Sequence, residues 1–247
     1  MRNLWYRFKT WVLVTFFNRV WIPEDTRPSP EEFSSSIQKE LPTLPPMVLK
    51  ETFIPPKDVW AEYVDRALET AIYPGVGTYV MYPFFGLLGE TGEIMEKYKK
   101  LYRDHDSHID QRFIDEMKKE LGDRMWYLAN CAKMLDLRFV DLFDMERWEE
   151  MKSSGTQNIT NAKEFEAALL RMAGATAAFF EPKRQEKYRD VGSIRRYFWF
   201  HIQKSSHYLF DILQYLGLTP EEVLLHNLRK LYDRKQRNKL AGSGDNR

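Results

Sequence analysis

Cysteine is the scarcest chemically reactive residue in this sequence. Of the 247 residues, only Cys131 is a cysteine, which excludes an internal disulfide framework and any zinc site built from several thiolates. A single thiol is typical of a protein in a reducing compartment, so we expect a cytoplasmic location.

An excess of charge of one sign is also lacking. The sequence has 37 Lys and Arg against 36 Asp and Glu, a formal net charge of +1. This balance argues against a chain-wide electrostatic attraction to nucleic acid or anionic lipid, and we expect no specific nucleic-acid partner.

Glycine and long hydrophobic runs are scarce as well. The 12 glycines provide little turn chemistry for a many-stranded fold, and runs that alternate apolar and polar residues are few. No stretch approaches the ~20 consecutive apolar residues needed to span a bilayer. Since 43% of the residues are apolar, there is enough material for a core, and the sequence predicts an all-α protein.

The N-terminal segment, residues 4–21, has the pattern of a broad amphipathic helix. We favour docking of this helix against the protein itself or a symmetry mate, and a membrane contact through residues 4–21 is the less favoured alternative. Residues 22–57 are rich in proline and predict an extended arm. The sequence therefore divides into this N-terminal region, 1–57, and a helical domain, 58–247.

The helical domain shows helical periodicity throughout, interrupted by short polar or glycine-containing breaks. We expect it to comprise an acid-bearing half, 58–155, and a second half, 156–247. The predicted helices are 59–72, 82–102, 111–135, 139–152, 162–180, 194–215 and 220–235.

Two short acidic segments carry the chemistry. Glu90 and Glu93 stand three residues apart in a glycine-rich stretch, as do Glu120 and Asp123, with Gly122 between them. Residues three apart share a helix face, so antiparallel packing of the two helices brings four carboxylates together. Such a set needs a cation, and oxygen ligands favour Mg²⁺, with Mn²⁺ as the alternative.

A plainer interpretation of these acids stays open. Surface carboxylates commonly pair with neighbouring bases, and Lys97, Lys119 and Arg124 are available for this purpose. It fits one isolated acidic pair better than two pairs that each contain a glycine and adjoin an apolar run.

The two acidic segments belong to a series of short motifs along the chain. The series is Gly86–Glu93, Lys99–Lys100 with Arg103–His105, Lys119–Ala129, Leu218–Val223, Asn227–Leu231 and Gly242–Arg247. In these motifs and their order, the sequence resembles the MazG-like, all-α nucleoside triphosphate pyrophosphohydrolases. The resemblance covers about 63–135 and 216–247 and includes Tyr63, Thr70 and Tyr73 in the helix before the first acidic motif. The family motif often begins with a pair of glutamates, whereas this sequence has Gly89 at the first position.

The resemblance implies a helical bundle that hydrolyses a nucleoside triphosphate, NTP or dNTP, to the monophosphate and pyrophosphate. It implies that Glu90, Glu93, Glu120 and Asp123 hold Mg²⁺ and that one of them orients the attacking water. The residues that would bind the substrate are Asn227, Lys230, Lys100 and Trp126. Of these, Lys230 would contact phosphates and Trp126 would offer its ring to a base, although aromatic residues at helical spacing are more often core. Family members are usually dimers or tetramers, so a homo-oligomer is expected.

Residues 136–215 separate the second acidic motif from the helix with Asn227 and Lys230, which usually follow each other directly in the family. Met172–Ala177 faintly resembles the first acidic motif without its acids, and Lys204 and Ser205 stand where acids would fall in the next helix. We therefore hypothesise a tandem pseudo-dimer with a degenerate second repeat; the alternative is an unrelated helical insertion. A functional alternative from another class is a non-catalytic nucleotide-binding protein or membrane-associated helical scaffold.

Overall fold

The computed structural model describes residues 53–77, 81–105, 108–181 and 191–240. The predicted amphipathic helix at 4–21, most of the proline-rich arm and the motif at 242–247 lie outside these residues. Within the described ranges the chain is all-helical, with seven α-helices, one 3-10 turn and no strand, which confirms the prediction of an all-α protein. The elements are α3 (Val59–Leu68), α4 (Met81–His105), α5 (Gln111–Leu135), η2 (Phe139–Leu142), α6 (Met145–Ser154), α7 (Ala162–Ala178), α9 (Val191–Tyr215) and α10 (Pro220–Gln236).

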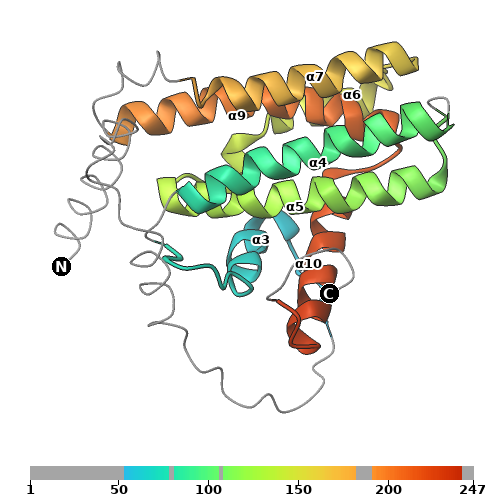
Figure 1. The fold of residues 1–247 in the computed structure, drawn as a ribbon. Helices are drawn as coiled ribbons and strands as arrows, with labels where there is room; N and C mark the ends of the chain where they lie inside the picture. Colours follow the sequence, from blue (N-terminus) through green and yellow to red (C-terminus); the bar gives the residue numbers. More distant parts are fainter. Residues whose placement is uncertain (1–52, 78–80, 106–107, 182–190, 241–247) are drawn as a thin grey trace, which may run out of the picture.

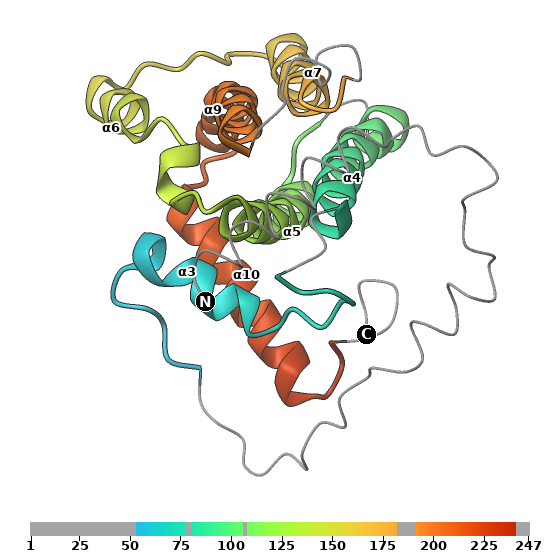
Figure 2. The same cartoon turned by 90° about the vertical axis from the view of Figure 1, so that its left-hand side faces the viewer.

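The helices form three tiers (Figure 1). Helices α4 and α5 make an antiparallel hairpin in the middle, α7 and α9 make a second hairpin above it, and α3 and α10 pack below. Seen along the hairpins, α5 lies between the α7–α9 pair and the α3–α10 pair (Figure 2). None of the described helices combines the length and the apolar character needed to cross a membrane.

Side-chain caps set the start of the helices that matter most here. Asp110 accepts a hydrogen bond from the backbone N–H of Phe113 at 2.8 Å and so begins α5. Thr219 and Glu222 form a reciprocal capping box at the start of α10, with Pro220 in its first turn. The observed first residues of α5 and α10 agree with the sequence prediction, because each cap is formed by residues within the first turn and is visible in the sequence.

Two predicted helices differ most from the observed ones, while the others match within three residues at each end. The first ends at Leu68 rather than at residue 72, and the Thr70 hydroxyl donates to the carbonyl of Ala67 just beyond that end. The predicted helix 139–152 is divided into η2 and α6, because Asp144 adopts a non-helical conformation and caps α6 by accepting from the N–H of Arg147.

The α4–α5 hairpin is held closely together at Gly86. A Cβ atom at this position would lie only 2.0 Å from Cε1 of Tyr127, so the Tyr127 ring packs directly against the glycine backbone. Gly92, six residues later on the same helix, has no atom within 4 Å of the equivalent point. The close approach of α4 to Tyr127 therefore depends on Gly86.

Gly86→Ala is expected to destabilise the fold by about 1–3 kcal/mol, because the new methyl group must push the Tyr127 ring away. Gly92→Ala is the matched control, and it should raise stability by up to about 1 kcal/mol because alanine favours the helix. Urea denaturation of both variants measures the difference. Equal changes in the free energy of unfolding would contradict the close contact.

A buried polar cluster lies between α5 and the α7–α9 hairpin. The guanidinium of Arg124, only 1% exposed, donates through Nη2 to the hydroxyl oxygens of Ser205 at 2.8 Å and Thr176 at 3.4 Å. Both hydroxyl groups also bond the carbonyl of Met172. Burial lowers the pKa of Arg124 to about 10, so this contact places a charge in the core.

Candidate metal centre

Three of the four predicted carboxylates converge between α4 and α5. Glu90 comes from α4, and Glu120 and Asp123 come from the facing side of α5. One carboxylate oxygen from each lies within 4.8 Å of the others. We call these residues the carboxylate triad. Glu93 is exposed and is not part of this group, so its predicted role as a ligand stays a prediction.

The triad is only partly balanced by neighbouring ammonium groups. Lys97 Nζ lies 3.0 Å from Glu120 Oε1, as the plainer interpretation of the acids anticipated for this residue. Lys230 Nζ lies 2.5 Å from both carboxylate oxygens of Asp123. Among the described residues Glu90 forms no ion pair with a basic side chain, so two ammonium groups face three carboxylates.

Electrostatics at Glu90 reflect this crowding. Burial is the largest cause that raises the pKa of Glu90 to about 8, followed by the negative charges of Asp123 and Glu120, while Lys230 acts in the opposite direction. Carboxylates arranged in this way repel one another unless a proton or a further cation joins them. Their all-oxygen donor set suits a hard divalent ion such as Mg²⁺ or Mn²⁺.

Helix α10 completes the site through Asn227. This side chain is fully buried, accepts a hydrogen bond from the Tyr63 hydroxyl at 2.8 Å and donates to Asp123 Oδ1 at 3.0 Å. It also packs on the backbone of α5, since a Cβ atom at Gly122 would lie 3.0 Å from its own Cβ. Asn227 is therefore held from two sides and fixes the orientation of Asp123.

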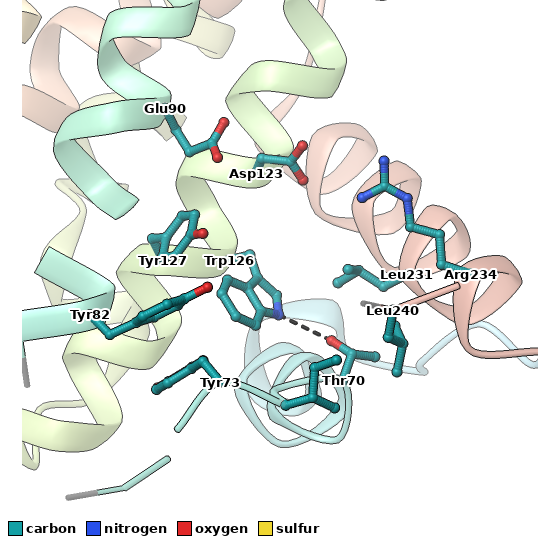
Figure 3. Close-up of a pocket in the computed structure, with 11 residues that line it drawn as sticks. Thr70, Tyr73, Tyr82, Glu90, Asp123, Trp126, Tyr127, Leu231, Arg234 and Leu240 are labelled. Atoms are coloured by element: carbon teal, nitrogen blue, oxygen red, sulfur yellow. Dashed lines mark hydrogen bonds between the residues drawn. The ribbon is translucent and has the colours of Figure 1, made fainter. Parts of the chain in front are cut away.

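A pocket opens beside Glu90 and Asp123 (Figure 3). Its volume is about 130 Å³, and we call it the aromatic pocket. Tyr82, Trp126 and Tyr127 line it below the carboxylates, and Arg234 faces it from α10. The pocket thus places ring surfaces and a guanidinium next to two members of the triad.

The other predicted substrate-binding residues have different outcomes. The ring of Trp126 lines the aromatic pocket, but its indole N–H is already bonded to the Ala67 carbonyl and the Thr70 hydroxyl. Its ring is thus fixed in place, and only its face is available. Lys100 is exposed and pairs with Glu96 at 3.4 Å, so the structure does not bring it to the triad.

Several residues of the site were not predicted from the sequence. Tyr82 and Arg234 were overlooked, and Lys97 was considered only as a base that could pair with the acids. Lys97 follows Glu90 by seven positions, and Arg234 follows Asn227 by seven, intervals that return to the same helix face. The signal was therefore present in the periodicity.

Comparison with known proteins shows a similarity to a phage protein. No family model matches the chain, and no solved structure matches it. Over 80 residues, 30% of this chain and 70% of the relative, the sequence is 46% identical to the Gene 37 protein of Mycobacterium phage L5. By that similarity, the chain belongs to the same family as this phage protein.

Proposed function

We propose that the protein is a Mg²⁺-dependent nucleoside triphosphate pyrophosphohydrolase, which hydrolyses an NTP or dNTP to the monophosphate and pyrophosphate. The observation that carries this proposal is the meeting of Glu90, Glu120 and Asp123 with Lys230 at the edge of a pocket. This combination offers oxygen ligands for a divalent ion and a cation for phosphate in one place. The motif resemblance supports the same reaction.

In this proposal the carboxylate triad would hold the metal ion, which would supply positive charge to polarise the phosphate oxygens. One carboxylate orients the water that breaks the bond between the α and β phosphates. Lys230 neutralises the phosphate charge, and Asn227, fixed by Tyr63, keeps Asp123 in its orientation. The tight packing of these side chains fits a site that must be organised before the substrate binds.

The aromatic pocket is the proposed position of the nucleoside. Tyr73 and Tyr82 stack with ring centroids 4.2 Å apart, and Trp126 and Tyr127 meet edge to face at 4.8 Å. A rigid group of rings beside a phosphate-binding region suits the stacking of a base. Arg234 at the pocket edge adds a positive charge for the phosphate end.

We also propose that the two hairpins are copies of one ancestral unit. The hydroxyl of Thr91 donates to the carbonyl of Leu87, and that of Thr176 donates to Met172. Thr176 follows Thr91 by the same number of residues as Met172 follows Leu87. The same number of residues separates Ser205 from Glu120. A crystal structure should show the hairpins superposing with Thr176 on Thr91; another register would indicate an unrelated insertion.

Release of pyrophosphate from a panel of NTPs and dNTPs tests the reaction. We expect turnover of at least one nucleotide with Mg²⁺ or Mn²⁺ and none after chelation with EDTA, because the triad would then lack its cation. Equilibrium binding of the same nucleotides is measured in parallel. Binding without turnover would identify a non-catalytic nucleotide-binding protein, and neither binding nor turnover would favour a scaffold.

A further inference from the structure

Lys230 contacts the carboxylate oxygens of Asp123, which are the atoms that a metal ion would need to bind. Its Nζ lies 2.5 Å from both Oδ1 and Oδ2, so the ammonium group spans the whole carboxylate. The two side chains are only 17% and 21% exposed, and a pair this sheltered is weakly screened by salt. Lys230 is thus an internal cation at the triad.

A divalent ion cannot bind the Asp123 carboxylate in the position that this ammonium group occupies. Lys97 neutralises Glu120 from the α4 side, whereas Lys230 faces Asp123 from α10. Binding a metal ion to Asp123 while Lys230 stays would bring like charges together within a few ångströms, which is unfavourable in a sheltered site. Moving Lys230 away without a new partner would cost it a charge-assisted hydrogen bond.

A phosphate group removes this conflict. An ammonium group that leaves a carboxylate can pair with a phosphate oxygen at little net cost, since both are charge-assisted contacts. Asp123 would keep its orientation during the exchange, because the Asn227 amide still donates to Oδ1 at 3.0 Å and is itself held by Tyr63. The site therefore has a fixed carboxylate and a cation able to change partners.

We propose that Lys230 competes with the divalent ion for Asp123, so that the metal ion binds together with the triphosphate rather than before it. The substrate releases Lys230 from Asp123, and Lys230 then pairs with a phosphate. This inference rests on the proposed function for the identity of the phosphate ligand, but the competition itself concerns only residues of this chain and a metal ion.

Binding of Mn²⁺ alone, followed by the loss of the free-ion signal in electron paramagnetic resonance, tests the competition. Lys230→Met and Lys230→Gln are expected to bind Mn²⁺ about ten-fold more tightly than the wild type, because the competing cation is gone. Lys235→Met is the matched control: it removes one positive charge from the same helix, where Lys235 pairs with Glu69 instead. This control should bind Mn²⁺ as the wild type does.

A second arm adds a non-hydrolysable α,β-methylene triphosphate. The wild type should bind Mn²⁺ more tightly with the analogue present, and the Lys230 variants should lose most of this gain. Unchanged or weaker Mn²⁺ binding by folded Lys230 variants without the analogue would overturn the proposal, and so would a tightening in Lys235→Met equal to that in the Lys230 variants. Mn²⁺ binding is measured without turnover, so it is independent of the pyrophosphate assay. Tighter Mn²⁺ binding in the Lys230 variants together with no pyrophosphate release by the wild type would reject the proposed function alone. Pyrophosphate release by the wild type together with unchanged Mn²⁺ binding in the variants would reject only the competition.

Discussion

Asp123→Asn is expected to lower the rate of pyrophosphate release by roughly 100-fold or more, since charged groups in such sites contribute several kcal/mol. Asp123 contacts Asn227 and Lys230 and belongs to the triad, so it connects the ligand set with α10. The amide keeps the shape of the side chain but removes the negative charge. Steady-state release of pyrophosphate, with the thermal midpoint as a measure of folding, checks this result.

Two further variants make the experiment specific to the triad. Asp115→Asn removes an exposed carboxylate from the same helix, where Asp115 contacts only Gln111 in the described structure, and should leave turnover unchanged. Glu93→Gln should retain most activity, because Glu93 lies outside the triad. Equal losses of activity in Glu93→Gln and Asp123→Asn would support the four-carboxylate site predicted from the sequence. Full activity in Asp123→Asn would contradict the proposed role of the triad.

Arg124→Met is expected to raise the free energy of unfolding by about 1–4 kcal/mol, because replacing buried charge with apolar side chains of similar volume often stabilises a protein. Burial alone lowers the pKa of Arg124, with no acidic neighbour among the causes. Its Nε and Nη1 atoms have no hydrogen-bond partner in the described part of the chain. Ser205 and Thr176 keep each other and the Met172 carbonyl as partners after the change.

Urea denaturation measures this stabilisation. Arg112→Met is the control, because Arg112 is an exposed residue of the same helix that pairs with Glu116; its effect should stay within about 0.5 kcal/mol. A loss of stability in Arg124→Met would show that the guanidinium gains more from its contacts with Ser205 and Thr176 than its burial costs.

Local chemistry made much of the fold predictable. The limits of α5 were predicted correctly because Asp110 caps its first turn and the apolar periodicity stops at Leu135. The start of α10 was equally clear from Thr219 and Pro220. Such signals act over three or four residues, so a single sequence contains them in full.

The details of the site depend on distant contacts and were harder to predict. Glu90 and Glu93 look equivalent in the sequence, yet only Glu90 points to the α5 carboxylates, a choice made by how α4 rotates against α5. Close packing at Gly86 contributes to that rotation. The charge partner of Asp123 lies 107 positions away on α10, beyond the reach of any local pattern.

The hydrogen bond between Tyr63 and Asn227 joins residues 164 positions apart, and this separation has a consequence for folding. The cost of closing a loop rises with its length, and contacts between distant residues slow folding. The α4–α5 and α7–α9 hairpins need only short connections, so they are expected to assemble first. Docking of α10 against α3 is then expected to come late, so that Asp123 meets Asn227 and Lys230 in the last stage of folding.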